Sequence, residues 1–79
     1  MTKPIIYTTP SCVYCRMAKA FFIEHNVEYE EKNVATDMEA QRDMIQKSGQ
    51  LGVPVIDFGD EIVIGFDKRK FQEKVGAAK

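Results

Sequence analysis

The sequence has no tryptophan, two cysteines, one histidine and three prolines in 79 residues. Two cysteines cannot form a framework of several disulfides, so the fold must depend on a hydrophobic core. The longest apolar runs span three or four residues, far below the about 20 that a membrane-spanning helix needs. The 11 basic and 12 acidic residues are spread without a basic block, which argues against a nucleic-acid-binding surface or a polybasic membrane patch.

The length and composition are those of one small globular domain covering residues 1–79. The chain is 44% hydrophobic and 29% charged, with a formal net charge of −1. Residues 1–4 pass directly into the apolar run Ile5-Ile6-Tyr7, without the longer apolar segment and cleavage site of an export signal. We therefore expect a cytoplasmic monomer. In that reducing compartment, a close cysteine pair is more often catalytic or metal-binding than structural.

The first half of the chain predicts a strand, a helix, a second strand and a second helix. Residues 5–8 form a β-branched and aromatic run that stops before Pro10, and the apolar repeat that follows predicts a helix ending near Asn26. A second, partly exposed strand ends near Asn33. The segment Thr36-Asp37-Met38-Glu39 has the pattern of a capping box that opens the second helix, and Gly49 ends it.

The second half predicts a hairpin and a last helix. Two apolar runs, residues 53–58 and 61–64, flank the turn signal Gly59-Asp60. Asp67 can cap a helix with Phe71 and Val75 on one face and Gly76 at its end. The order βαβαββα predicts an α/β fold with a four-stranded mixed sheet flanked by helices. The side chains expected in its core are Phe21, Phe22, Met44, Ile45, Phe58 and Phe71.

The chemistry is expected at Cys12-Val13-Tyr14-Cys15, where the first strand meets the first helix. Two intervening residues allow the sulfurs to approach across one helical turn, so the pair can cycle between dithiol and disulfide. Cys12 lies at the helix N-terminus, where free backbone N–H groups stabilise a thiolate, and is predicted to be the nucleophile. Cys15, one turn further on, is predicted to be the resolving thiol.

The alternatives to redox chemistry are metal sites and inert core cysteines. A structural zinc ion needs four ligands, and this chain offers the two cysteines and His25, which lies about three turns beyond Cys12. A metal or iron–sulfur site that shares Cys12 between two chains stays open. The redox hypothesis itself requires no metal and no organic cofactor.

Three separated segments resemble the signature segments of glutaredoxins. They are Ile6-Tyr7-Thr8-Thr9-Pro10-Ser11-Cys12-Val13-Tyr14-Cys15, Gly52-Val53-Pro54 and Ile64-Gly65-Phe66-Asp67. The resemblance implies a minimal thioredoxin fold, with a cis Val53–Pro54 bond that faces the cysteines. It also implies a thiol-disulfide oxidoreductase that acts on proteins or small molecules. Its substrate-binding residues would be Thr9, Tyr14, Val53, Pro54, Gly65, Phe66 and Asp67.

Four positions depart from the pattern of glutathione-using glutaredoxins, which carry Pro, Lys, Thr and Gly where this chain has Val13, Thr9, Gly52 and Phe66. Without the Lys, one cation for a glutathione carboxylate is missing, and Phe66 adds bulk where the γ-glutamyl end would lie. Val13 and the Gly65-Phe66 pair are similar to NrdH-redoxins, and the whole is most similar to small YruB-type glutaredoxin-like proteins. The electron donor is thus predicted to be a thioredoxin-type reductase, with glutathione as the alternative.

The remaining candidates have structural interpretations beside the functional ones. The exposed ring of Tyr14 is predicted to contact a partner, and Asp67 is equally a helix cap. Thr9 is more simply interpreted as a loop residue, and His25 is interpreted as a cation at a helix end. Arg42 and Lys47 are expected to be solvated charges on the second helix.

Overall fold

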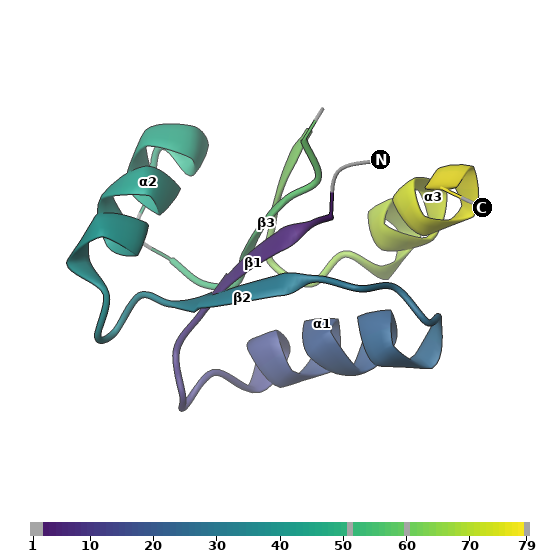
Figure 1. Cartoon of the computed structure of the whole chain (residues 1–79), viewed down its shortest axis with the longest axis horizontal. Coiled ribbons are helices and arrows are strands. Elements are labelled where there is room, and N and C mark those ends of the chain that lie inside the picture. The colour runs from purple at the N-terminus through teal and green to yellow at the C-terminus, as the bar shows by residue number, and fades with distance from the viewer. Residues whose placement is uncertain (1–2, 51, 60, 79) are drawn as a thin grey trace.

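The computed structural model describes residues 3–50, 52–59 and 61–78, and it contains the expected seven elements in the expected order (Figure 1). The strands are β1 (Ile5–Thr8), β2 (Glu30–Asn33), β3 (Val55–Asp57) and β4 (Ile62–Ile64). The helices are α1 (Val13–Glu24), α2 (Met38–Ser48) and α3 (Lys68–Ala78). None of these helices is long and apolar enough to cross a membrane.

The four strands form one mixed sheet in the order β2-β1-β3-β4, which confirms the predicted fold class. β1 pairs in parallel with β2, as a βαβ unit requires, and β3 runs antiparallel to both β1 and β4. β3 and β4 are shorter than the apolar runs that predicted them. The N–H of Phe58 donates to the carbonyl of Glu61 (3.0 Å) across the turn, while Asp60 of the turn signal lies outside the described residues.

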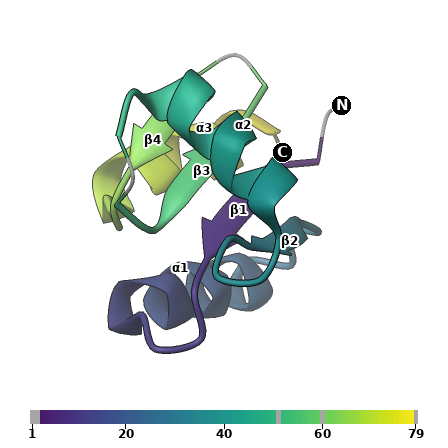
Figure 2. The same ribbon diagram turned by 90° about the vertical axis from the view of Figure 1, so that its left-hand side faces the viewer.

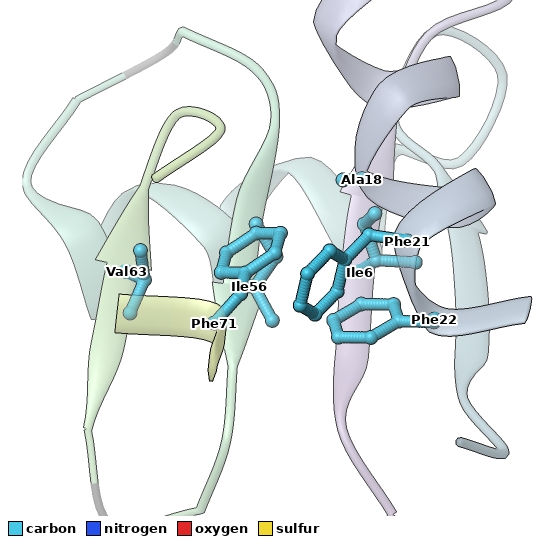
Figure 3. Close-up of a cluster of buried hydrophobic side chains, with 7 residues drawn as sticks. All are labelled: Ile6, Ala18, Phe21, Phe22, Ile56, Val63 and Phe71. Carbon is cyan, nitrogen blue, oxygen red and sulfur yellow. The ribbon is translucent and has the colours of Figure 1, made fainter. Parts of the chain in front are cut away.

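Helices cover both faces of the sheet, and Figure 2 shows α1 and α2 on opposite sides of β1. Beneath α1 and α3 lies the larger cluster of buried side chains (Figure 3), made of Ile6, Ala18, Phe21, Phe22, Ile56, Val63 and Phe71. The cluster beneath α2 consists of Tyr7, Val34, Ala40, Met44 and Val55. Strand residues alternate between the two clusters because successive side chains point to opposite faces of a sheet.

Two predictions for α2 are wrong in detail. Its N-cap is Asp37 and not Thr36: the Asp37 carboxylate accepts from the N–H of Ala40 at 3.1 Å, one residue later than the capping box places it. Ile45, expected in the core, is 40% exposed, since Ala40 and Met44 fill the stripe that faces the sheet. Gly49 ends the helix as predicted, in the left-handed conformation (φ +74°).

The last helix runs past the predicted stop at Gly76 to Ala78, so this glycine does not end it. The predicted position of Val75 beside Phe71 concerns a side chain outside the described residues. Phe58, also expected in the core, is half-buried and packs against the rim of the larger cluster.

Lys47, expected to be solvated, instead holds a buried polar group under α2. Its ammonium donates to the hydroxyl of Tyr7 at 2.9 Å and pairs with the carboxylate of Asp57 at 2.8 Å. Tyr7 is fully buried, and the Lys47 cation also lies 5.4 Å from its ring centroid. Helix α2 is thereby linked to β1 and β3 by polar contacts as well as by apolar packing.

Replacing Lys47 by Met is expected to lower the free energy of unfolding by about 1–3 kcal/mol, because the buried Tyr7 hydroxyl loses its donor. Tyr7→Phe removes the hydroxyl itself and keeps the Lys47–Asp57 ion pair, so its cost should be smaller. Urea unfolding of both variants beside the parent measures the difference. A loss for Lys47→Met no larger than that for Tyr7→Phe would contradict this view of the contact.

The same contact gives the fold a dependence on acid. Burial acts to raise the pKa of Asp57, but the hydrogen bonds from Lys47 and from the Gly59 N–H, with the Lys47 charge, outweigh it. The pKa of Asp57 is therefore held below its ordinary value of 3.8. This contribution to stability is complete above pH 3.8 and is lost as the pH falls through the lowered pKa.

Candidate active site

Cys12 lies at the junction between β1 and α1, where the sequence analysis predicted it. β1 ends at Thr8, a short loop follows, and Cys12 is the N-cap of α1 in an extended conformation. Its N–H donates to the carbonyl of Thr9 at 3.3 Å, which closes the loop. Its Sγ accepts from the backbone N–H of Cys15 at 3.1 Å, and the side chain is half-buried. The sulfur thus takes the place of a capping oxygen, where N–H groups and the helix dipole favour negative charge.

Cys15 lies one turn further along α1 in a different environment. It is 1% exposed, and burial raises the pKa of its thiol to about 12, assisted by its hydrogen bond to Cys12. A backbone hydrogen bond from Thr9 and the charge of Lys19 act in the opposite direction. The two cysteines therefore differ in access: Cys12 is half-open at a helix end, whereas Cys15 is enclosed, and burial keeps its thiol protonated.

The Val53–Pro54 peptide bond is cis, as the resemblance implied. Pro54 is buried and Val53 half-buried. Because Tyr7 pairs with Val55, the next position in register places Pro54 opposite Thr8, at the end of the sheet where the cysteine loop begins. The carbonyl of Pro54 accepts from the N–H of Gly65 at 2.8 Å, and Gly65 has the positive φ (+82°) that favours glycine. Segments far apart in sequence therefore meet at one end of the sheet.

The exposed apolar side chains near Cys12 come from the first turn of α1. Val13 is 62% exposed and Tyr14 is 60% exposed, so both can contact another molecule. Thr9 is half-buried, and its shown contacts are made by its backbone.

Phe66, predicted to add bulk where the γ-glutamyl end of glutathione would lie, packs between two helices. Its ring is half-buried and packs edge-on against Phe71 at 5.3 Å and against Phe21 at 6.4 Å between centroids. It therefore joins α1 to α3, with one side lining a shallow groove between these helices. Asp67 caps α3 through the N–H of Lys70 (3.2 Å), as its structural interpretation predicted.

Three residues that the sequence analysis did not single out form a polar chain beside the cysteines. The hydroxyl of Thr8 donates to Glu31 Oε2 at 2.8 Å, and Lys19 Nζ reaches the same oxygen at 2.9 Å. Thr8 is 1% exposed. The sequence spacing could have identified Lys19, because it follows Cys15 by four residues and so lies on the same helix face. His25, the histidine weighed as a metal ligand, packs instead on Phe21 at 4.2 Å.

Acidic, cysteine and histidine side chains do not gather in threes anywhere in residues 3–50, 52–59 and 61–78 in a way that could hold a metal ion. Within one chain, the described site offers two thiols, backbone N–H groups and apolar surface, with the polar chain of Thr8, Glu31 and Lys19 beside them.

Comparison with known proteins places this chain in a family. The glutaredoxin family model matches residues 5–63. The chain is 36% identical over 70 residues to an uncharacterised glutaredoxin-like 8.6 kDa protein in the rubredoxin operon of Clostridium pasteurianum, covering 89% of this chain and 93% of that protein. It is 39% identical over 74 residues to glutaredoxin 1 of Rickettsia conorii, covering 91% of this chain and 72% of that one.

A solved structure agrees with these sequence matches. The crystal structure of a variant of a thioredoxin-like protein superposes with a TM-score of 0.88 at 30% identity, covering 96% of this chain and 97% of the other. A cysteine pair at a helix N-terminus, a cis proline at the same end of the sheet and a β2-β1-β3-β4 strand order occur together here. On this evidence the chain is a small member of the thioredoxin superfamily and belongs to the glutaredoxin family.

Proposed function

We propose that the protein is a dithiol oxidoreductase that reduces disulfides of proteins or small molecules through Cys12 and Cys15. One observation carries the proposal: Cys12 is half-buried and its sulfur accepts a hydrogen bond from the Cys15 N–H at 3.1 Å, while Cys15 is enclosed beside it. The partly exposed position of Cys12 at the helix N-terminus suits a nucleophilic thiolate. The enclosed position of Cys15 suits a thiol that acts only after a substrate has bound.

The reaction proceeds in two exchanges. The Cys12 thiolate attacks one sulfur of the substrate disulfide, so that a Cys12–substrate bond forms and the other sulfur leaves as a thiolate. Cys15 then gives up its proton to solvent and attacks Cys12 Sγ. This step forms the Cys12–Cys15 disulfide and releases the second substrate thiolate, so that two electrons have passed to the substrate.

The proposed setting is the cytoplasm, where thiols are kept reduced, with the protein acting as a monomer on disulfide-containing partners. Its oxidised form must be reduced by a donor, for which we infer a thioredoxin-type reductase. Thr9 stands where a Lys would bind a glutathione carboxylate. The exposed Val13 and Tyr14 offer apolar area to a protein donor, at about 25 cal/mol per Å² buried.

The test measures turnover of one disulfide substrate with two donor systems. With NADPH and a thioredoxin reductase we expect faster reduction of the Cys12–Cys15 disulfide than with millimolar glutathione and glutathione reductase. Efficient turnover with glutathione and poor turnover with each reductase would identify glutathione as the donor and overturn this part of the proposal. The absence of turnover in both systems would overturn the proposed function.

A variant provides the matched control for the donor assay. Thr9→Lys combined with Gly52→Thr restores two features of glutathione-using glutaredoxins and should shift preference towards glutathione. A Cβ at Gly52 would meet Gln50 Nε2 at 3.3 Å, a tight contact that the end of this flexible side chain can relieve by a small shift. Phe66 is left unchanged so that core packing stays intact.

A further inference from the structure

Cys15 presents a chemical problem that the two-step mechanism leaves open. Its thiol must ionise to attack the mixed disulfide, yet burial raises its pKa to about 12. While Cys12 is free, its hydrogen bond and charge also raise the pKa of Cys15. In the mixed disulfide Cys12 carries no charge, so burial is opposed by what remains: the Thr9 backbone and the cation of Lys19.

Lys19 is placed to act on Cys15 by helix geometry and by a tether. Residues four apart lie on the same face of a helix, and long helical side chains lean towards the helix N-terminus, here over the turn that contains Cys15. The ammonium is fixed by Glu31 of β2 at 2.9 Å. Glu31 is fixed in turn by the hydroxyl of Thr8 at 2.8 Å.

The tether directs the cation to the active-site end of the sheet. Glu31 pairs with Ile6 in the parallel ladder, but its carboxylate extends to Thr8, the last residue of β1. Thr8 precedes Thr9, whose backbone bonds to the Cys15 thiol. Among the described residues, the ionisable groups that act on the Cys15 thiol are Cys12 and Lys19 from its own segment, with Glu31 of β2 behind Lys19.

We propose that Lys19, held by Glu31 and Thr8, is a positioning residue that favours the Cys15 thiolate in the second exchange and so sets the rate of resolution. This inference rests on the proposed function and assigns a role within it. The alternative is a purely structural role, in which the Lys19–Glu31 ion pair only holds α1 against β2. The two ideas differ in which step of the reaction depends on Lys19.

The experiment follows both exchanges in one reaction. Reduced protein is mixed with equimolar dithiodipyridine, an uncharged disulfide whose thiol product absorbs light, in a stopped-flow instrument. The fast phase reports attack by Cys12, and the slow phase reports attack by Cys15 on the mixed disulfide. For Lys19→Met we expect the rate constant of the fast phase to be unchanged. The rate constant of the slow phase should fall by about threefold to tenfold at neutral pH, and the midpoint of its pH dependence should move upward.

Three further variants separate electrostatics from structure. Lys19→Arg should keep the parent slow phase. Lys32→Met removes another cation paired with a β2 glutamate, Glu30 at 3.8 Å, and should change neither phase. The double variant Lys19→Glu with Glu31→Lys keeps an ion pair between α1 and β2 but puts a negative charge on the helix face of Cys15. Its slow phase should therefore be no faster than that of Lys19→Met.

The outcomes distinguish this inference from the proposed function. A slow phase in Lys19→Met equal to that of the parent at every pH, or one restored by the swapped pair, would overturn the role of Lys19 alone. A fast phase that persists in Cys12→Ser, or a slow phase that persists in Cys15→Ser, would overturn the proposed function itself.

Discussion

Cys12→Ser is expected to reduce the rate of disulfide reduction to the uncatalysed background, while Cys15→Ser should accumulate a mixed disulfide with its substrate. A serine hydroxyl at the N-cap accepts the same backbone hydrogen bond as Cys12 Sγ, so the helix is preserved and the nucleophile is lost. In Cys15→Ser the first exchange still proceeds, but no intramolecular thiol remains to release the substrate. Turnover of insulin disulfides measures the first effect, and non-reducing mass spectrometry of the captured adduct measures the second.

The two variants control for one another. They replace sulfur by oxygen at sites one helical turn apart, and thermal unfolding of each checks that the fold survives. Equal yields of captured partner from both variants would mean that the roles of nucleophile and resolving thiol are assigned wrongly. Faster alkylation of Cys15 than of Cys12 near neutral pH, measured on the two single-cysteine variants, would also contradict this assignment.

Phe71→Ala is expected to lower the free energy of unfolding by about 3–5 kcal/mol. Phe71 is fully buried, and its ring stacks on Phe22 at 5.3 Å and meets Phe21 edge-on at 5.5 Å. Its removal leaves a cavity where α3 joins α1 and the sheet. Small domains have about 5–15 kcal/mol of stability in total, so this one change should bring the protein close to unfolding at physiological temperature. Urea or thermal denaturation followed by circular dichroism measures the loss.

Two other substitutions serve as controls for the stability loss expected of Phe71→Ala. Phe58→Ala removes a half-buried ring from the rim of the same cluster and should cost clearly less. Ile23→Ala removes an apolar side chain that is 65% exposed on α1 and should change stability by less than about 0.5 kcal/mol. If all three variants unfolded at similar denaturant concentrations, Phe71 would not be the centre of the core.

The sequence predicted those features that depend on local pattern. The βαβαββα order follows from runs of apolar residues and their breakers, and the place of Cys12 follows from a strand that ends at Thr8 just before a helical repeat begins. The cis bond at Pro54 came from the family resemblance, since local chemistry at an X–Pro bond favours trans.

The errors lie where tertiary contacts decide. Thr36 and Asp37 are both good capping residues, and which of them caps α2 depends on how the chain leaves β2. Ile45 is as apolar as Met44, but one helix can present only one stripe to the sheet. Lys47 was assigned to solvent because its partners, Tyr7 and Asp57, come from strands that only the folded topology brings near.

The hydrogen bond between Gly65 and Pro54 also fixes the direction of every amide along β4. In an antiparallel ladder inward and outward backbone groups alternate, so Val63 bonds to β3 as Gly65 bonds to Pro54. The amides of Ile62 and Ile64 then face away from the sheet along its outer edge. Among the described residues β4 is an edge strand of only three residues, and so short an edge with two outward amides is a poor template for another strand beside the site.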